Sequence, residues 1–182
     1  MQLHFQIMPS ERELAHGNLA PSESGGQARS PMPLSIRLHE QMEPVEACWR
    51  ALETENALSL HQSYDWCRSW VESHACRLLI VEGFSAGCTH LLLPFEIVRR
   101  GPIRIARFLA APFSNINTGL YSQDFRTLAA PPRLRQALET ARSQLARHCD
   151  IFVLENMPLD WRGAQNPFCD LPSVLNQNAS FQ

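Results

Sequence analysis

The sequence of 182 residues contains no lysine, and all 16 of its basic side chains are arginines. Its formal net charge is only −2. A charge so close to zero excludes the strong positive field with which many proteins bind nucleic acid or an anionic membrane. The arginines that lie closest together in the sequence straddle one turn: Arg99, Arg100, Arg104 and Arg107. We interpret the absence of lysine as compositional bias, not as a selection of arginine for anion binding.

Long apolar runs and paired cysteines are also absent. No stretch reaches the roughly 20 apolar residues that a membrane-spanning helix needs, so we expect no stable insertion into a membrane. The N-terminus, MQLHFQIMPSERELAHG, lacks the basic start and the uninterrupted apolar core of a signal peptide. The six cysteines form no C-x-x-C pair and are irregularly spaced. These absences predict a cytoplasmic protein with reduced thiols.

Turn-forming residues divide the chain into three parts. The segment PSESGGQARSPMP ends at Pro33 and lacks apolar periodicity, so we predict a disordered tail over residues 1–33. Residues 34–158 contain every strongly periodic segment and are expected to form one folded lobe. Residues 159–182 show weak periodicity and several structure-breaking residues.

Apolar periodicity predicts the order of the elements within the lobe. The expected elements are a strand at 34–39, a helix from Pro44, a helix capped by Ser63, strands at 76–82, 88–99 and 103–109, a loop at 110–130, a helix from 131, and a strand at 150–155. Pro94 falls inside one strand and predicts a bulge or a splayed, partly unpaired position there. The order β-α-α-β-β-β-α-β predicts a mixed α/β fold with a largely antiparallel sheet flanked by helices.

Six segments occur in a suggestive order over residues 34–168: QSYDWCRSW, LLIVEG, LLLPFEIVRRGPIRIARFLA, SNINTGLY, DIFVLENMP and NPF. In this order they resemble the CelD/BcsL group of GNAT-type, FemAB-like acetyltransferases, which are associated with bacterial cellulose and polysaccharide production. The resemblance implies a GNAT-like fold. It also implies an acyl-CoA co-substrate and a small-molecule or glycan acceptor.

Proteins of that group are about twice as long and pair two GNAT-like lobes, the second of which is usually assigned the acyl-CoA machinery. The resemblance therefore implies that this chain is an N-terminal lobe whose residues 159–182 begin the connection to a second lobe, or that a partner supplies that lobe. Two alternatives stay open: a catalytically inactive binding or assembly module, and a truncated gene product.

The resemblance also implies where the acyl-CoA pyrophosphate would be held. A GNAT site uses a Q/R-x-x-G-x-G/A turn, whose backbone N–H groups hold the pyrophosphate at a helix N-terminus. The corresponding segment here, SNINTGLYSQDFRTLAAPP, has a single glycine, Gly119. We therefore expect no cofactor-binding residues in this chain.

Two carboxylates are candidates for acid–base chemistry. Glu96 and Glu155 each fall in an apolar strand, where desolvation can raise the pKa of a carboxyl group. A base beside the acceptor amine would suit acyl transfer. The alternative is a strand-end carboxylate that faces solvent or pairs with an arginine.

Five residues are candidates for substrate binding. Trp66 and Trp70, spaced i, i+4, indicate either core packing or a platform for carbohydrate. Asn115, Asn117 and Tyr121 lie on the long loop, where neutral hydrogen-bonding groups carried by a sheet often form sites. The alternative for the asparagines is turn chemistry, in which each side chain bonds the nearby backbone.

Two further groups of histidine, cysteine and aspartate residues lie close together in the sequence. His61, Cys67, His74 and Cys76 lie within a short span, but Cys67 and His74 are about 10 Å apart along a helix, too far to share one zinc ion. His148, Cys149 and Asp150 are adjacent and so point in different directions. We expect neither a metal site nor a nucleophilic triad.

Overall fold

The computed structural model describes residues 2–8, 33–55, 59–125, 131–161, 164–166, 168 and 174–175. Its strands are β1 (Gln2–Met8), β2 (Ser35–His39), β3 (Leu78–Ser85), β4 (Cys88–Arg100), β5 (Ile103–Phe108), β6 (Leu120–Tyr121), β7 (Ile151–Pro158), β8 (Asp160–Trp161), β9 (Ala164–Gln165) and β10 (Val174–Leu175). Its helices are η1 (Glu43–Val45), α1 (Glu46–Glu55), η2 (Leu60–Gln62), α2 (Tyr64–His74), α4 (Pro131–Thr140) and α5 (Arg142–His148).

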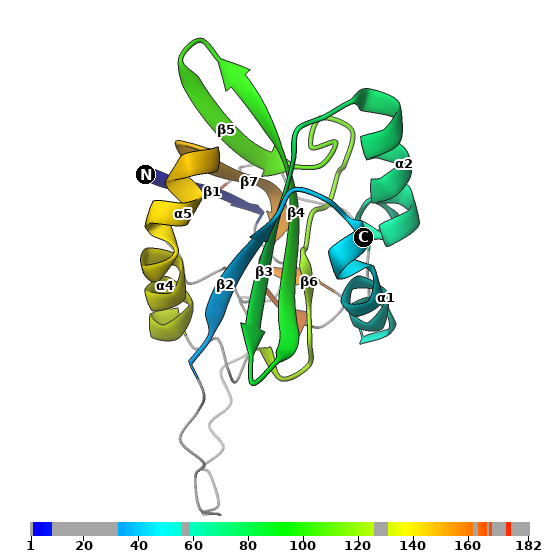
Figure 1. The fold of residues 1–182 in the computed structure, drawn as a ribbon, viewed down its shortest axis with the longest axis vertical. Coiled ribbons are helices and arrows are strands. Elements are labelled where there is room, and N and C mark those ends of the chain that lie inside the picture. The colour runs from blue at the N-terminus through cyan, green and yellow to red at the C-terminus, as the bar shows by residue number, and fades with distance from the viewer. Residues whose placement is uncertain are drawn as a thin grey trace, which may run out of the picture.

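One eight-stranded sheet forms the centre of the fold, in the order β10-β1-β7-β5-β4-β3-β2, with β6 paired to β4. Strands β2 to β5 form an antiparallel meander, and β5, β7, β1 and β10 pair in parallel. Helices α1 and α2 lie on one side, and α4 and α5 on the other (Figure 1). The predicted mixed α/β fold with a largely antiparallel, helix-flanked sheet is confirmed.

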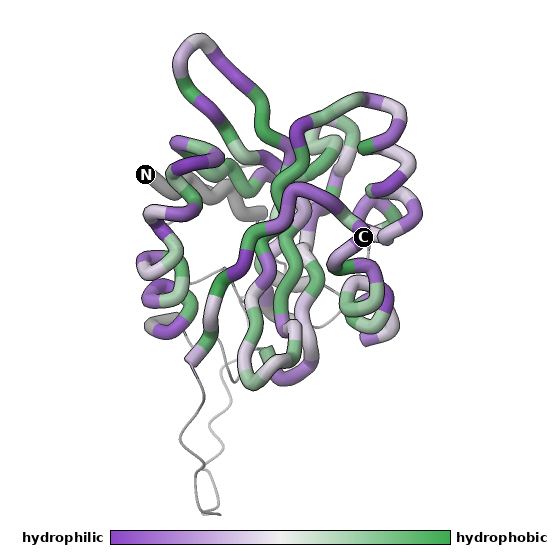
Figure 2. Tube along the Cα trace, viewed as in Figure 1, coloured by the Kyte–Doolittle hydropathy of each residue, from purple (hydrophilic) through white to green (hydrophobic). Residues whose placement is uncertain are grey.

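The two faces of the sheet bury two separate hydrophobic cores because side chains alternate along a strand. On β3, Leu79 and Val81 pack toward α4 and α5, whereas Leu78 and Ile80 pack toward α1 and α2. Figure 2 shows hydrophobic residues running along the central strands, with many hydrophilic residues on the helices. The central strands are thus buried on both faces, which explains their nearly continuous apolar sequences.

The first residues differ from the tail that we expected over residues 1–33. Gln2–Met8 forms β1, which pairs in parallel with β7 on one side and with β10 on the other. The alternation of Leu3, Phe5 and Ile7 with polar residues is a strand signal that the prediction missed. Residues 9–32 lie outside the described residues. Of the expected connection, 159–182, the short strands β8, β9 and β10 are described.

The bulge expected at Pro94 is absent, but a change of neighbour occurs there. Pro94 pairs with Ile80 without a register shift, and the shift in that ladder falls instead between Gly83 and Phe84. On the other edge of β4 the ladder with β5 ends at Phe95, and the Pro94 carbonyl accepts a hydrogen bond from Leu109 N (3.2 Å). Because proline has no N–H to donate, the strand loses a ladder bond where β5 departs.

Candidate functional site

The parallel pair β5 and β7 defines the edge of the sheet where the candidate site lies. Their ladder is short and joins Ile105–Arg107 to Ile151–Val153. Beyond it the two strands separate, and the loop after β5 comes to lie beside β7. In open α/β sheets, ligands bind outside the carboxyl ends of the strands, where neighbouring connections diverge. The carboxyl ends of β5 and β7 are therefore the first place to look for a site.

The loop at this edge is fixed to β7 by its asparagines. Asn117 is 1% exposed, donates from its backbone N to the carbonyl of Asn156 (3.0 Å), and donates from Nδ2 to the carbonyl of Glu155 (3.0 Å). Asn156, which adopts a φ of 57°, returns a bond from Nδ2 to the carbonyl of Ser114 (2.9 Å). The amide side chain of Asn117 therefore bonds the backbone of a distant strand, which differs from the local turn chemistry given as its alternative.

Gln62 links the same loop to the helices on the α1 and α2 side. Its side chain is 1% exposed, and Oε1 accepts from Thr118 N (2.9 Å) and from Thr118 Oγ1 (2.5 Å). Its backbone carbonyl accepts from Trp49 Nε1 (3.1 Å). Nε2 is buried and has no hydrogen-bond partner among the described residues. Buried polar groups without a partner are rare, so this amide is a notable feature of the site.

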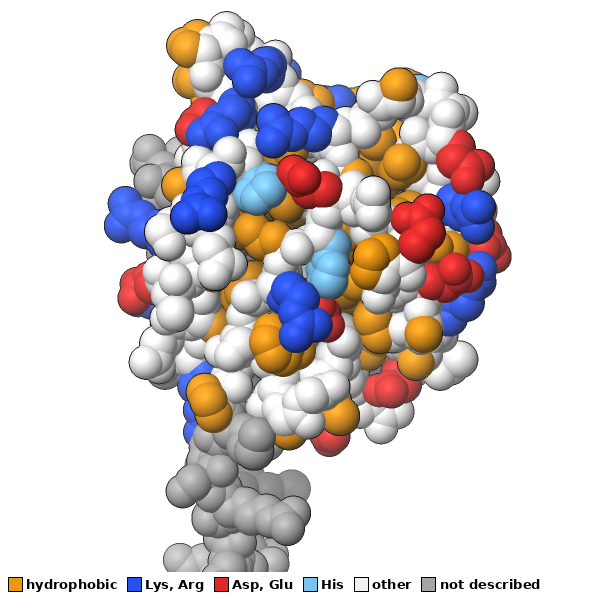
Figure 3. Space-filling model, in the orientation of Figure 1, with side chains coloured by type: hydrophobic (Ala, Val, Ile, Leu, Met, Phe, Trp, Pro, Cys, Tyr) orange, Lys and Arg blue, Asp and Glu red, His pale blue; other side chains and the backbone are white. Residues whose placement is uncertain are grey.

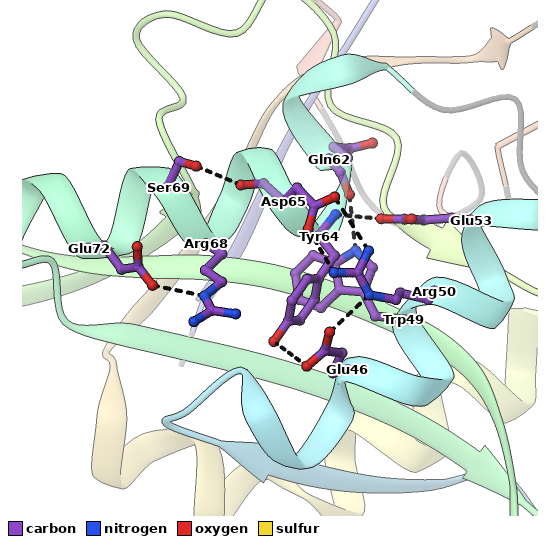
Figure 4. Close-up of polar contacts among 10 residues, drawn as sticks. All are labelled: Glu46, Trp49, Arg50, Glu53, Gln62, Tyr64, Asp65, Arg68, Ser69 and Glu72. Carbon is purple, nitrogen blue, oxygen red and sulfur yellow. Dashed lines mark hydrogen bonds and ion pairs between the residues drawn. The ribbon is translucent and has the colours of Figure 1, made fainter.

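A polar contact set holds α1 against α2 and so positions the aromatic residues of α2 (Figure 4). Arg50 pairs with Asp65 (2.7 Å) and with Glu46 (2.9 Å), and its guanidinium lies 4.6 Å from the centre of the Tyr64 ring. Hydrogen bonds from Arg50 hold the pKa of both carboxyl groups below their ordinary values. The ion pairs of Arg50 thus join α1 to α2, and we assign these three charged residues a structural role.

The N-terminus of α2 is capped by a residue other than the one expected. Ser63 occupies the cap position, but its hydroxyl donates to the carbonyl of Leu60 (2.9 Å) and makes no capping bond. The backbone N–H of Tyr64 instead donates to the Glu53 carboxylate on α1. A carboxylate is favourable there because it lies at the positive end of the helix dipole.

Aromatic side chains form a continuous strip along α2, which we call the aromatic strip: His61, Trp66, Trp70, His74 and Phe113. Trp70 stacks on Trp66 (centroids 5.6 Å apart) and on His74 (3.7 Å), and it also contacts Phe113 (5.6 Å) from the loop. Trp66 and Trp70 are partly buried, and Phe113 is 69% exposed. Because neighbouring rings cover Trp70, a sugar would find little free stacking surface on it.

The two candidate carboxylates have different surroundings. Glu96 is 6% exposed, and its Oε1 pairs with Arg107 Nε at 2.8 Å across the β4–β5 ladder. Glu155 lies within β7, two residues past the end of its ladder with β5, is partly exposed, and has no ion pair among the described residues. Next to Glu155 the ladder between β7 and β1 shifts register, and Asn156 adopts a φ of 57°, so Glu155 lies at a bulge of the strand. The arginine-pairing alternative thus applies to Glu96 and not to Glu155.

The remaining loop candidates do not all meet at this edge. Asn115 is exposed on the loop segment that Asn117 fixes to β7. Tyr121 pairs with Leu91 in the sheet and stacks with Phe125 (6.1 Å), within the core on the α4 and α5 side. The structure thus brings Asn117 beside Glu155, with Asn115 on the same segment, and places Tyr121 against the core on the α4 and α5 side.

The clustered arginines lie on the β4–β5 hairpin, where Figure 3 shows basic side chains gathered. Arg104 pairs with Asp150 (2.7 Å) and donates to the carbonyls of Ala146 (2.8 Å) and Arg147 (2.6 Å) at the end of α5. Hydrogen bonds from the Arg104 side chain and from its backbone N–H lower the pKa of Asp150 to about 2. Together with the Arg107 pair, this gives half of the cluster a structural role.

The cysteine and histidine constellations are also explained by local structure. Burial raises the pKa of the Cys149 thiol to about 12 and also raises that of Cys67, so both thiols stay protonated. His148 Nδ1 lies 3.1 Å from the Glu40 carboxylate, and the Asp150 carboxylate forms an ion pair with Arg104. Within the described residues, no group of three or more His, Cys, Asp or Glu side chains is arranged to hold a metal ion.

Four backbone amides in the described part of this loop are not free to hold the pyrophosphate of an acyl-CoA. They already donate within the chain: those of Phe113 and Ser114 to Ala110, that of Asn117 to Asn156, and that of Thr118 to Gln62. Pyrophosphate binding needs several such amides free and pointing at the ligand. A ligand at this loop would have to break bonds that fix the loop to β7 and η2.

The single glycine of the loop and the helix that follows point the same way. Gly119 has a φ of +73°, and an added Cβ would lie 2.5 Å from Leu93 Cδ2, so this glycine serves close packing. Helix α4 begins with Pro131 and Pro132, which have no N–H to offer an anion. Residues 126–130, which lead into α4, lie outside the described residues, so the absence of a GNAT-type pyrophosphate turn stays a prediction.

Among the helices of the described residues, none combines the length and the apolar character that crossing a membrane requires.

Comparisons with known proteins give only distant likenesses. No family model and no curated protein matches the chain. Among solved structures, it is similar to the ribosomal-protein-alanine N-acetyltransferase from Brucella melitensis biovar Abortus 2308 (11% identity, 82% of this chain and 98% of that chain, TM-score 0.48). It is also similar to a GNAT family acetyltransferase from Staphylococcus aureus (12% identity, 83% and 98%, TM-score 0.44). A third is a predicted acetyltransferase with acetyl-CoA from Clostridium acetobutylicum (8% identity, 82% and 96%, TM-score 0.41). Likenesses this distant carry no argument about the activity of this chain.

Proposed function

We propose that this chain is the acceptor-side lobe of an acyl-CoA-dependent N- or O-acyltransferase that acts in polysaccharide or cell-envelope production. The observation that carries the proposal is the position of Glu155. Its partly exposed carboxylate lies at the carboxyl end of the parallel pair β5 and β7, with no ion pair among the described residues. The order of helices and meander, which resembles GNAT-type acetyltransferases, supports the same class.

Glu155 would act as the general base. As the acceptor amine or hydroxyl attacks the thioester carbonyl, it forms a new C–N or C–O bond and loses its proton to the Glu155 carboxylate. The C–S bond breaks, and the departing thiolate takes up a proton. Asn115, exposed on the neighbouring loop segment, would hydrogen-bond a hydroxyl or amine of the acceptor. Asn117 would act indirectly, because its bond to the Glu155 carbonyl fixes the backbone that carries the base.

The acyl donor would be held by a second lobe or by a partner protein. Four occupied amides in the described part of the loop support this division of labour, because a pyrophosphate would need such amides free. A docking surface of suitable chemistry lies close by. Leu60 (71% exposed) precedes His61 of the aromatic strip in sequence, and Phe113 (69% exposed) belongs to the strip; exposed apolar side chains often mark interfaces.

A second candidate function is a catalytically inactive binding or assembly module. The same closed loop favours it, because a lobe without a donor site needs no chemistry of its own to serve as a scaffold. The two functions differ in whether Glu155 contacts an acceptor.

Calorimetric titration with a panel of amines and amino sugars tests the proposal. We expect one class of acceptor to bind, and we expect Glu155→Gln to weaken its binding by about tenfold or more, as loss of a hydrogen bond to a charged group does. Glu139→Gln, which alters an exposed carboxylate on α4, is the matched control and should change nothing. If no acceptor binds, or if both variants bind the acceptor equally well, the acceptor-side proposal is wrong. The hypothesis of an inactive binding or assembly module is then favoured.

A further inference from the structure

The outer edge of β2 lies at the end of the eight-stranded sheet, and no strand of the described residues pairs with it. Helix α4 runs beside this edge (Figure 1), and a groove of about 370 Å³ lies between them. Its walls come from Pro33–Ile36 on the strand side and from Arg133, Gln136, Thr140 and Gln144 on the helix side. The unpaired edge of a strand offers a row of N–H and C=O groups to any extended chain.

We propose that this groove binds an extended acidic peptide, which adds to the sheet as a strand beside β2. Strand addition draws its affinity from main-chain hydrogen bonds and its specificity from side-chain contacts at alternate positions. The inference does not depend on the acyltransfer proposal, because neither Glu155 nor any residue of the aromatic strip lines the groove.

The length of the groove suits a short extended segment. Arg133 and Gln144 are separated by about 16 Å along the helical path, at 1.5 Å for each residue. The hydrogen bonds from Ala141 N to the Ala137 carbonyl (3.0 Å) and from Leu145 N to the Ala141 carbonyl (2.9 Å) keep that path helical across the junction of α4 and α5. A strand covers the same distance with about five residues, so a peptide of that length fills the groove and passes Ser35 and Ile36, the residues of β2 that line it.

Charge on both sides of the edge favours an acidic occupant. Arg133 is the charged residue among those that line the groove, and it has no ion pair among the described residues. Arg37, on the opposite face of β2, is held by Glu82 (3.4 Å) and by the Phe84 ring (4.3 Å), and its side chain stays 56% exposed. An added strand would present alternate residues to these two arginines, so carboxylate side chains at both kinds of position would be stabilised.

A second copy of this chain is a poorer occupant. Two β2 strands paired edge to edge would bring Arg37 of each copy close together, and like charges in facing strands destabilise the pairing. The groove-lining Arg133 would likewise find no partner of opposite charge on another β2, because that strand contains no carboxylate.

The test uses fluorescence anisotropy with a short fluorescein-labelled peptide of alternating valine and glutamate. We expect saturable binding to the purified chain. A peptide with lysine in place of glutamate should bind at least about tenfold more weakly, as the loss of ion-paired hydrogen bonds implies. Two further peptides are N-methylated at alternate residues in opposite phase. One phase should abolish binding and the other should leave it, because a strand donates toward its neighbour only from every second residue.

Matched protein variants locate the site. Arg133→Glu should weaken binding by at least about tenfold, whereas Arg135→Glu, an exposed change on the same helix outside the groove, should leave it within about twofold. Thermal unfolding of both variants verifies that they are folded. The proposal is overturned if the glutamate peptide does not bind at millimolar concentration, if both N-methylated peptides bind alike, or if Arg135→Glu weakens binding as much as Arg133→Glu. Dimerisation of the chain through β2 in sedimentation would also overturn it.

Discussion

Removing the Gln62 side chain should destabilise the protein and release the loop after β5, which contains Thr118, from η2. In Gln62→Ala, the Thr118 N–H loses its partner inside the core, while the Thr118 hydroxyl keeps a bond to the Gly119 carbonyl (3.0 Å). An unsatisfied buried donor costs about 1–3 kcal/mol. Gln62 Nε2 has no partner among the described residues, so deleting it also removes the cost of burying an unpaired donor. The net loss in the free energy of unfolding is therefore about 2 kcal/mol.

Differential scanning calorimetry measures this loss. About 2 kcal/mol corresponds to a fall in Tm of about 4–8 °C for a chain of this size. Gln144→Ala, which shortens an exposed glutamine on α5, is the control and should shift Tm by less than about 1 °C. A double-mutant cycle with Thr118→Ala should give a coupling of about 0.5–3 kcal/mol, as contacting residues do. A Gln62→Ala fall in Tm no larger than that of the control, or a coupling of zero, would refute the role assigned to this hydrogen-bonded pair.

Three further predictions concern packing, charge and thiol chemistry. Gly119→Ala should destabilise by about 1–3 kcal/mol more than Gly87→Ala, because both glycines have positive φ but only the first would meet a neighbour, at 2.5 Å; equal losses in denaturant titrations would refute this. The pKa of Asp150 is lowered from 3.8 to about 2, so its ion pair stabilises the fold above about pH 4 and that stability is lost as pH falls toward 2. Tm measured from pH 5 to pH 2 should therefore fall less steeply in Asp150→Asn, and an unchanged slope would contradict the assignment. Iodoacetamide should label the exposed Cys88 well before the buried Cys67 and Cys149, as mass spectrometry of peptides can show; comparable rates would be evidence against their burial.

The meander and its helices could be predicted from the sequence because their signals are local. Alternation along 34–39, the stripe that contains Trp49, and the Gly101-Pro102 turn each require only neighbouring residues. Even the Glu96–Arg107 pair follows from local rules. The two-residue turn sets Arg100 opposite Ile103, and counting back along both strands brings Glu96 opposite Arg107. The prediction stopped before that count and so kept Glu96 as a catalytic candidate.

The connections of the site loop could not be predicted in the same way. Gln62 and Thr118 are 56 residues apart, and no periodicity links a residue of η2 to a residue of the loop. The partnership of Asn117 with β7 depends on the end of the β5–β7 ladder, which is a property of the assembled sheet. Strand β1 was missed for a different reason: its alternation is visible, but its neighbours β7 and β10 lie at the far end of the chain. Patterns within a short stretch of sequence carry no information on such pairing between distant segments.

The central claim is that this chain carries an acceptor site and no acyl-CoA site, and isothermal titration calorimetry with acetyl-CoA tests it most directly. With the loop amides occupied and α4 beginning in two prolines, we predict no measurable binding up to about 1 mM, equivalent to a binding free energy weaker than about −4 kcal/mol. A dissociation constant in the micromolar range for the chain alone would contradict the claim. It would show that the loop opens and that the lobe holds its own acyl donor.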